Sequence, residues 1–464
     1  MSRPTLFCLH ALGSSAREFD ALSSAVSDVF DVVAVDLAGF GGSPIDVGVT
    51  VDDMVRDVEN VIAQARSNRW MLVGHSMGGK VASLVAARSL AGDARLFGLA
   101  GVVLLAASPP SPEPMEDDRR STMLAWAARG RLGDAAAREF VDANVGAPLT
   151  SPDDVSAIGD VLRTSREAWI AWLARGSRED HSAEVGTLDI PAVLVAGGAD
   201  GDLNEEAQRR LNAPHYPRAR IVSLAGAGHL LPWERPAEVA RLILDLWHDE
   251  AGTSPEVPGD FALTLASART SAKTRGILAR RAVADDPAYA PRLLNARQLS
   301  TLRILADLVV PQIGPAIDLA ARVDAQLAAG SGDGWRNDLL PIDSEAYRLA
   351  LDGLVDIGDL PEAEQKARLT AIVAGDFVPD AGTLSGPQVT AWFEDARVDL
   401  VRQWLAHPAT MSRVGYDGVS NGGDGLGRPG LGRTGHGDAT RIEGFHLLLP
   451  SEREGWEPAM EGLR

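Results

Sequence analysis

The stretch 72–80, which reads Leu-Val-Gly-His-Ser-Met-Gly-Gly-Lys, constrains the fold of this chain more than any other. The short apolar run 70–73 predicts a buried strand, and apolar residues at helical spacing over 80–90 predict a helix. Residues 74–78 must then form a tight turn, in which glycines let strand and helix approach closely while the Ser76 hydroxyl is exposed. The pattern Gly-x-Ser-x-Gly favours a nucleophilic serine over an ordinary glycine-rich loop.

Residues 1–248 alternate between short apolar runs and amphipathic helices. Strands separated by helices predict βαβ units and a mainly parallel sheet of about six strands. The segment 109–187 reads instead as several helices, near 119–129, 134–144, 153–164 and 167–175. An insertion of this size predicts a helical cap over the carboxyl ends of the strands, where open α/β sheets bind ligands. The expected strands are 5–10, 32–36, 70–73, 102–106, 192–196 and 220–224.

A serine nucleophile needs a base at neutral pH, and the base needs an acid that fixes its tautomer. Asp200 follows the expected strand 192–196, and His229 follows the strand 220–224 in the run Gly-Ala-Gly-His. Because the carboxyl ends of parallel strands meet at one edge of the sheet, we expect both side chains beside Ser76. Asp202 is the alternative acid, and we favour Asp200 because it lies nearer the strand end.

A tetrahedral oxyanion needs two backbone N–H groups aimed at it. One is expected from the residue after the nucleophile, Met77. The other is expected from the loop that follows the first strand, His-Ala-Leu-Gly-Ser-Ser at 10–15, where Leu12 is the candidate donor. The alternative is that residues 10–15 form a simple turn.

The sequence offers weaker signals around this site. Three tryptophans of the cap are candidates to line an acyl pocket, although a place in the core of the cap is favoured for each: Trp126, Trp169 and Trp172. Five histidines lie in polar or linker contexts and are expected at the surface: His181, His215, His248, His407 and His446. No residue is assigned to a metal or a cofactor.

Charge and cysteine content exclude several classes of function. The net charge of -20 argues against nucleic acid or an anionic membrane surface as a partner, because phosphate contacts need clustered Lys and Arg. Cys8 is the only cysteine, so an intrachain disulfide and a cysteine-based metal site are excluded. The first apolar run is short and reads as a strand rather than a signal peptide, and no run reaches about 18 apolar residues. We therefore expect a cytoplasmic protein.

The second half of the chain has a different texture. Residues 249–260 are polar with two prolines and suit a linker, and residues 261–464 predict an all-helical domain with a glycine-rich tail at 415–437. The run 425–430 matches Gly-x-Gly-x-x-Gly, but no strand precedes it, so we predict no nucleotide binding there. The expected helices are 263–283, 298–310, 316–327, 344–356, 362–374 and 387–407.

Taken together, the motifs of the first half resemble the α/β-hydrolase superfamily over residues 1 to 250. They are His-Ala-Leu-Gly-Ser-Ser, Asp-Leu-Ala-Gly-Phe-Gly-Gly-Ser at 36–43, Gly-His-Ser-Met-Gly-Gly, Gly-Gly-Ala-Asp200 and Gly-His229. The resemblance implies an α/β-hydrolase fold with a Ser-His-Asp triad that acts on a small-molecule ester or lactone. Ala11 departs from the glycine usual in the oxyanion loop. Esterases, lactonases, carbon–carbon hydrolases and cofactor-free perhydrolases all stay open, because the fold does not fix the substrate.

The second half resembles the small-subunit family of gluconate 2-dehydrogenase over residues 290 to 425. The resemblance rests on Leu-Ser-Thr-Leu at 299–302, Ala-Asp-Leu-Val-Val-Pro at 306–311, Trp-Leu-Ala-His-Pro at 404–408, and Gly-Tyr-Asp-Gly at 415–418 followed by Asn-Gly-Gly. It implies a flavin-dependent oxidoreductase as a partner, with the flavin held by that partner. A non-catalytic accessory subunit of such an oxidoreductase is therefore the alternative to a serine hydrolase for the chain as a whole.

Overall fold

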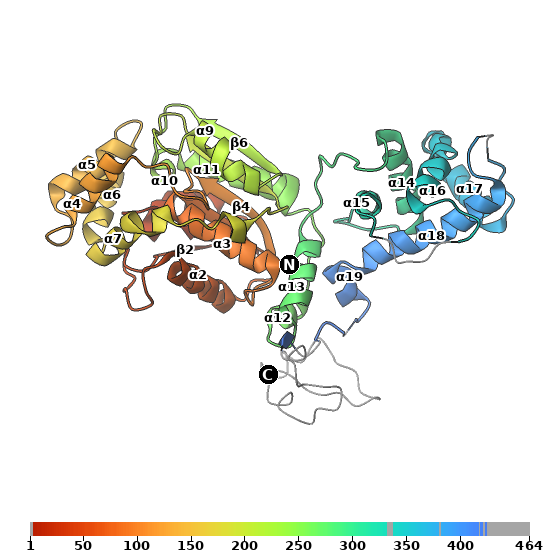
Figure 1. Cartoon of the computed structure of the whole chain (residues 1–464), viewed down its shortest axis with the longest axis horizontal. Helices are drawn as coiled ribbons and strands as arrows, with labels where there is room; N and C mark the ends of the chain where they lie inside the picture. Colours follow the sequence, from red (N-terminus) through yellow and green to blue (C-terminus); the bar gives the residue numbers. More distant parts are fainter. Residues whose placement is uncertain (1–2, 332–336, 380–381, 417, 421–422, 425–464) are drawn as a thin grey trace, which may run out of the picture. The chain divides into compact units, whose positions relative to one another are not determined.

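The structure is a computed structural model that describes residues 3–331, 337–379, 382–416, 418–420 and 423–424 (Figure 1). The chain divides into two compact units. The α/β unit comprises the chain up to Gly252, the segment Glu256–Ala284 and the segment from Gly415 onward. The helical unit comprises Thr253–Pro255 and Asp285–Val414. Of the glycine-rich tail, residues 417, 421–422 and 425–437, with the motif at 425–430, lie outside the described residues.

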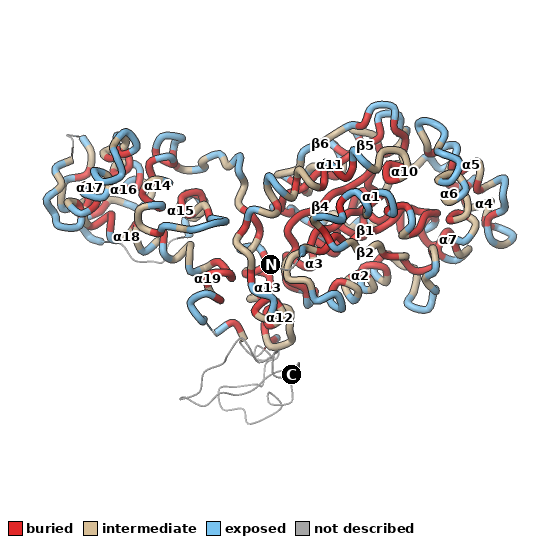
Figure 2. Tube along the Cα trace, turned by 180° about the vertical axis from the view of Figure 1, so that it is seen from behind, coloured by how far each residue is buried: buried red, intermediate tan, exposed pale blue. Residues whose placement is uncertain are grey.

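Six parallel strands form the sheet of the α/β unit, in the order β2-β1-β3-β4-β5-β6. This confirms the expected fold class, and each expected strand is present with small shifts at its ends. The four inner strands are buried along their length because helices cover both faces of the sheet, whereas the edge strands β2 and β6 are only partly buried (Figure 2). The six strands are β1 (Thr5–Leu9), β2 (Asp31–Val35), β3 (Trp70–His75), β4 (Leu99–Leu105), β5 (Ala192–Gly197) and β6 (Ala219–Leu224).

Alternate residues of each strand face opposite layers of helices. On one face Cys8, Val73 and Val103 pack in a cluster with residues of α1 and α11. Helix α3, which follows Ser76, packs against β1, β3 and β4 and against α2. The helices outside the cap are α1 (Asp20–Val26), α2 (Val51–Ala65), α3 (Met77–Ala91), α9 (Glu205–Ala207), α10 (Leu231–Glu234) and α11 (Pro236–Leu246).

The segment between β4 and β5 forms the helical cap that the sequence predicts. Its helices pack in pairs, α4 with α7 and α5 with α6. The middle of the cap is apolar, with the Phe140 ring 5.2 Å from Trp169 in a T-shaped contact. The cap helices are α4 (Asp117–Trp126), α5 (Asp134–Asn144), α6 (Ser151–Arg163), α7 (Arg166–Ala174) and α8 (Ser182–Val185).

The expected single helix over 263–283 is wrong in one respect, because it is two helices, α12 (Gly259–Ala266) and α13 (Ala272–Ala282). Hydroxyl side chains compete for the helical backbone between them: the Thr270 hydroxyl donates to the Thr264 carbonyl, and Ser271 caps α13 by accepting from the Thr274 N–H. Both helices belong to the α/β unit, and α13 packs on α3. The sequence instead predicts that the first domain ends at residue 248 and that the helical domain begins at residue 261. Those boundaries stay a prediction about domains that fold independently.

The buried Arg275 of α13 ties these helices to the α/β unit. Its guanidinium donates to the carbonyls of Gly92 at 2.7 Å, Thr270 at 2.8 Å and Leu265 at 3.0 Å. These bonds satisfy carbonyls at the carboxyl ends of α3 and α12, where the helices leave acceptors without an internal partner.

The helical unit has its own core and no strand among its described residues. Trp392 lies in this core with Tyr347, and their rings are 5.5 Å apart in a T-shaped contact. Capping boxes begin two of the helices, through Asn295 with Gln298 and through Ser385 with Gln388. The helices are α14 (Ala296–Val309), α15 (Leu319–Ala328), α16 (Asp343–Asp352), α17 (Glu362–Ala374), α18 (Gly386–Leu405) and α19 (Pro408–Arg413).

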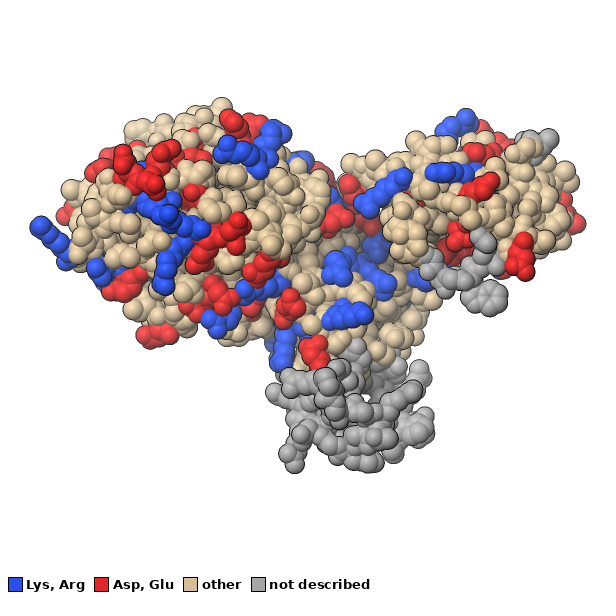
Figure 3. Space-filling model, in the orientation of Figure 1, with Lys and Arg blue, Asp and Glu red and all other residues tan. Residues whose placement is uncertain are grey.

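Neither the distribution of surface charge nor the described helices indicate a membrane-spanning segment. Figure 3 shows acidic and basic side chains intermingled on the visible face of the α/β unit. None of the described helices has both the length and the apolar character needed to cross a bilayer.

Candidate active site

Ser76 lies in a strained turn between β3 and α3. Its φ of 50° and ψ of -116° place it in a left-handed conformation that a serine rarely adopts. A Cβ on Gly74 would lie 2.6 Å from the Gly78 carbonyl oxygen, and a Cβ on Gly78 would lie 2.2 Å from the Leu9 carbonyl oxygen. Only glycine fits at either position, so the structure explains both glycines of the Gly-x-Ser-x-Gly pattern by steric contact.

The structure brings Ser76, His229 and Asp200 together in one hydrogen-bonded chain. The Ser76 hydroxyl is 2.8 Å from His229 Nε2, and His229 Nδ1 is 2.7 Å from Asp200 Oδ2. Asp200 Oδ1 accepts from the N–H groups of Asp202 and Leu203, which fixes the carboxylate. Asp202, the alternative acid, is paired with Arg119 instead. Each of the three groups comes from the carboxyl end of a different strand, as the sequence predicts.

The charges of this chain of residues favour an ionised acid and a basic imidazole. Burial opposes ionisation of Asp200, but the His229 charge and the hydrogen bonds that the carboxylate accepts outweigh it and lower the pKa of Asp200 to about 2. Burial lowers the pKa of His229, yet the Asp200 carboxylate outweighs burial and raises that pKa above its usual value. The imidazole is therefore held with its Nδ1–H donating to the Asp200 carboxylate and its Nε2 lone pair towards Ser76.

Leu12 and Met77, the expected oxyanion donors, both adjoin the nucleophile. Leu12 lines the same cavity as Ser76, and Met77 is the first residue of α3. Neither backbone N–H has an acceptor among the described residues, so both are available to an oxyanion. Gly13, with φ of 72°, is the residue of this loop whose conformation favours glycine, whereas Ala11 is not among the residues with positive φ.

Glu18 and His75, to which the sequence gave no role, support the site from behind. Both side chains are fully buried, and His75 Nδ1 is 2.9 Å from Glu18 Oε1. The same carboxylate oxygen accepts from the Ala11 N–H, and His75 Nε2 is 2.8 Å from the His229 carbonyl oxygen. A carbonyl can only accept, so Nε2 carries a proton, and Nδ1 is the ring nitrogen that bonds to Glu18. This pair links the oxyanion loop, the turn and the base loop.

His10 is fixed in a neutral form by its partners. Its Nδ1 donates to the Ala11 carbonyl at 2.7 Å, and its Nε2 accepts from the Leu37 N–H at 3.0 Å. Burial lowers the pKa of His10, in agreement with this neutral tautomer. His10 therefore holds the loop that carries Leu12 without adding a charge to the site.

A small cavity of about 30 Å³ lies between the catalytic loops and the cap. One part of its wall is apolar, with Met115, Met123, Phe140 and Trp172 from the cap. Of the three tryptophans, only Trp172 lines this cavity; Trp169 is in the core of the cap, and the Trp126 ring lies 6.4 Å from it. The other part is polar and also contains residues that the sequence did not single out: Glu113, Arg119 and Asn144.

Backbone contacts join the cap to the catalytic loops. The Asn144 carbonyl, at the end of α5, accepts from the His229 N–H at 2.8 Å and from the Leu230 N–H at 3.2 Å. The buried Lys80 of α3 donates to the carbonyls of Gly176 at 3.1 Å and Glu179 at 2.9 Å, and burial lowers its pKa to about 8. The cap therefore holds both the base loop and the nucleophile helix.

The residues that sequence reasoning missed gave little signal. A glutamate in the first turn of a helix, such as Glu18, is ordinary at a solvated surface. His407, expected at the surface, is buried in the helical unit, where its Nδ1 accepts from the Ala409 N–H and its Nε2 lies 3.2 Å from the Ser254 hydroxyl. That expectation was wrong because His407 caps α19, and a capping side chain looks polar in sequence. His181 and His215 are half-buried, His248 is exposed, and His446 lies outside the described residues.

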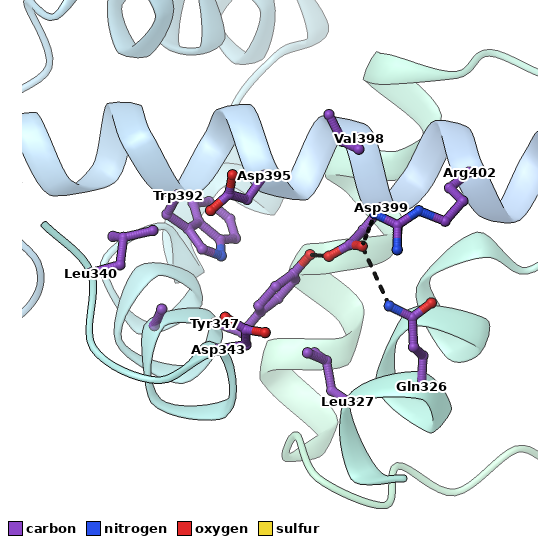
Figure 4. Close-up of a pocket in the computed structure, with 11 residues that line it drawn as sticks. Gln326, Leu327, Leu340, Asp343, Tyr347, Trp392, Asp395, Val398, Asp399 and Arg402 are labelled. Carbon is purple, nitrogen blue, oxygen red and sulfur yellow. Dashed lines mark hydrogen bonds and ion pairs between the residues drawn. The ribbon is translucent and has the colours of Figure 1, made fainter. Parts of the chain in front are cut away.

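A second cavity, of about 240 Å³, lies in the helical unit (Figure 4). Asp399 on α18 accepts from the Tyr347 hydroxyl at 2.6 Å and from Gln326 at 3.4 Å, and it pairs with Arg402 at 3.3 Å. Figure 4 shows these side chains converging from three helices. The network stabilises the packing of α18 on α15 and α16. A search of the described residues found no cluster of His, Cys, Asp and Glu that could hold a metal ion.

Comparison with known proteins agrees with this geometry. A sequence model of the Alpha/beta hydrolase family matches residues 6–242, about half of the chain. The chain is 26% identical over 251 residues to YugF, an uncharacterized hydrolase of Bacillus subtilis, which covers 52% of this chain and 89% of that protein. It is 25% identical over 254 residues to a pimeloyl-(acyl-carrier protein) methyl ester esterase of Proteus mirabilis, with 52% and 90% covered.

A solved structure also resembles part of the chain. The enol-lactonase from Burkholderia xenovorans LB400 is similar over 53% of this chain and 92% of that chain, with 20% identity and a TM-score of 0.46. The family match itself spans β1 to α11 and includes Ser76, Asp200 and His229. The chain is therefore a hydrolytic enzyme that belongs to the alpha/beta hydrolase family.

Proposed function

We propose that the α/β unit is a serine hydrolase that cleaves a carboxylic ester, a lactone or a related acyl bond through Ser76, His229 and Asp200. The observation that carries the proposal is the chain of two short hydrogen bonds from Ser76 to His229 and from His229 to Asp200. A serine is a weak nucleophile alone, and this arrangement is the one that activates it.

The reaction follows from the geometry of these groups. Ser76 Oγ attacks the substrate carbonyl carbon while its proton moves to His229 Nε2, and Asp200 stabilises the imidazolium that forms. The N–H groups of Leu12 and Met77 bind the oxyanion of the tetrahedral intermediate. The imidazolium then protonates the leaving alcohol. Water, deprotonated by His229, attacks the acyl-enzyme and releases the acid.

Labelling with a fluorophosphonate tests this proposal. We expect one equivalent of the probe on Ser76, found by mass spectrometry of the folded protein, and no labelling of Ser76→Ala. Absence of labelling in folded wild-type protein would favour the alternative, a non-catalytic accessory subunit whose triad has no function.

For the helical unit we propose a binding role towards a flavin-dependent sugar dehydrogenase. The support is the resemblance of residues 290 to 425 to the small subunit of gluconate 2-dehydrogenase. Oxidation of a sugar at its anomeric carbon gives a lactone, and a tethered hydrolase would meet that lactone at high effective concentration. Copurification of a flavin-containing chain tests the partner. A screen of sugar lactones against p-nitrophenyl esters tests the substrate, and lactones that hydrolyse no faster than background would contradict the lactone part.

A further inference from the structure

Glu113 places a carboxyl group in the wall of the catalytic cavity, in the segment that joins β4 to the cap. It lines this cavity together with Ser76 and His229. Its backbone N–H donates to the Ser177 carbonyl at 2.7 Å, and the Ser108 hydroxyl donates to its Oε2 at 2.9 Å. Backbone and side chain are therefore both held in place, as recognition of a substrate group requires.

One oxygen of this carboxyl group lacks a partner. Glu113 Oε1 accepts no hydrogen bond from the described residues. It is not one of the fully buried polar atoms that lack a partner, so it remains accessible. Arg119 already bonds to Asp202 and to the Asn144 side chain. Asp202 also keeps one carboxylate oxygen without a hydrogen bond, but its charge is paired with Arg119, whereas Glu113 forms no ion pair among the described residues. Among the described lining residues, Glu113 thus offers an acceptor to whatever the cavity holds.

The surroundings make such a partner valuable. Burial raises the pKa of Glu113 above its usual value, and the Ser108 hydroxyl and the charges of His229 and Lys80 offset only part of this rise. A carboxyl group removed from water is costly unless it is hydrogen-bonded, so a donor on the bound molecule would replace the water that the cavity loses when it fills. The cavity is small, which favours a short chain on that molecule.

We propose that the substrate carries a hydroxyl or an amino group on a short acyl chain, and that Glu113 Oε1 accepts a hydrogen bond from it. This inference rests on the proposed hydrolase function, because it concerns the acyl group that Ser76 receives. The shared chemistry is a hydrogen-bond donor. A hydroxyl and an ammonium group differ in charge, so variants of Glu113 can tell them apart.

The test compares kcat/KM for p-nitrophenyl esters of butyrate, a hydroxybutyrate and an aminobutyrate. These acyl groups have similar length, so the ratio of two kcat/KM values reports recognition of the donor. We expect wild-type protein to favour at least one donor-bearing ester over butyrate by about 10-fold or more. Glu113→Met should abolish the preference. Glu113→Gln should keep part of a preference for hydroxyl and lose a preference for ammonium.

Glu179→Gln is the matched control, because Glu179 is another glutamate of the cap whose side chain pairs with His181 and does not line the cavity. It should leave the ratios unchanged. An equal rate for all three esters in wild-type protein, or a preference that survives in Glu113→Met, would overturn the inference. Should Glu113→Met not fold, the change in ratios of Glu113→Gln decides.

Fluorophosphonate labelling of the same preparations separates the two levels of failure. Labelled wild-type protein without a donor preference overturns the role of Glu113 and leaves the hydrolase proposal standing. Wild-type protein that is neither labelled nor active on any ester overturns both.

Discussion

Ser76 shows how a single residue can combine strain with reactivity. Its φ of 50° holds the hydroxyl towards His229 rather than into α3. A side chain in this conformation costs on the order of 1–3 kcal/mol, which the contacts of the turn must offset. The Ser76 N–H donates to the Leu105 carbonyl and the Ser76 carbonyl accepts from Gly79 and Ser108, so three backbone hydrogen bonds hold the strained residue.

The strain at Ser76 gives a prediction about stability. Both Ser76→Ala and Ser76→Gly should lose hydrolysis, but only glycine adopts the left-handed conformation without a Cβ clash. We expect Ser76→Gly to be more stable than Ser76→Ala by about 1 kcal/mol, measured by urea denaturation. Equal stability of the two variants would show that the turn is not strained in solution.

The second prediction concerns the pH dependence of hydrolysis. His229 must be neutral to accept the Ser76 proton, and Asp200 raises the pKa of His229. Activity should therefore rise with pH, with the midpoint of kcat/KM above the value of about 6.5 of an ordinary histidine.

Asp200→Asn supplies the control for this pH dependence. It removes the charge that favours the imidazolium, so the midpoint should move to lower pH while the rate falls by on the order of 10⁴. Asp202→Asn changes the neighbouring carboxylate that pairs with Arg119, and it should leave the rate within a few-fold of wild type. A midpoint that stays in place in Asp200→Asn would contradict the assignment of the acid.

The third prediction concerns the buried pair Glu18 and His75. Glu18→Ala leaves His75 Nδ1 and the Ala11 N–H without their acceptor. Leaving a buried polar group without its partner typically costs about 1–3 kcal/mol, and kcat should fall because the loops of Leu12 and His229 lose their common support. Denaturation and steady-state kinetics measure the two effects.

Glu18→Gln separates charge from shape at this position. It keeps a group of the same size, so it should restore part of the stability and less of kcat. Nitrogen-15 NMR of His75 gives an independent readout, since Nε2 should carry a proton in both proteins because the His229 carbonyl can only accept. An unprotonated Nε2 in wild-type protein would contradict this contact.

At the scale of elements, α3 links the nucleophile turn to the cap through Lys80. Its ammonium group is fully buried and satisfies two cap carbonyls. Lys80→Met keeps the apolar stem of the side chain but leaves both carbonyls without a donor. We expect a loss of about 1–3 kcal/mol in the free energy of unfolding, measured by urea denaturation of the whole chain.

Lys366→Met is the control for Lys80→Met. Lys366 pairs with Glu362 on the exposed face of α17, where a salt bridge contributes little. The variant should be indistinguishable from wild type in the same assay. A loss at Lys80 no larger than at Lys366 would show that the cap does not depend on this contact.

The elements themselves were the most predictable part of the chain. Each strand of the sheet has a continuous apolar run, and α5 and α17 match their predicted bounds because periodicity and local signals agree there. The break at Ser267–Ser271 was missed because serine and threonine are compatible with a helix until their side chains find backbone partners.

The triad positions could be predicted because each residue follows a recognisable strand. Glu18, His75 and Glu113 could not be assigned roles in the same way, since their importance depends on burial and on partners distant in sequence. The contact between His75 and the His229 carbonyl joins residues 154 positions apart. Pattern and spacing describe the segments of a chain, while such contacts exist only after the sheet has formed.

At the scale of the whole molecule, each of the two units has a hydrophobic core among its described residues. One lies under the sheet with Val73 and Val103, and the other surrounds Trp392 and Tyr347. Because each unit buries its own apolar residues, we expect two transitions in calorimetry. Trp392→Ala should reduce the free energy of unfolding of the helical unit by about 3–5 kcal/mol, as for other large-to-small core changes. The transition of that unit should then move to lower temperature while the other transition stays in place. Equal displacement of both transitions would show that the units unfold together.

The bond from the His229 N–H to the Asn144 carbonyl limits how this enzyme can be re-engineered. Exchange of caps between relatives is an obvious route to new substrates, since the cap is one continuous insertion. Here, however, the last turn of α5 supplies an acceptor to the loop that carries His229. A chimera must therefore place a carbonyl at the same point. A foreign cap that lacks this carbonyl would alter the position of His229, which the exchange was meant to leave unchanged.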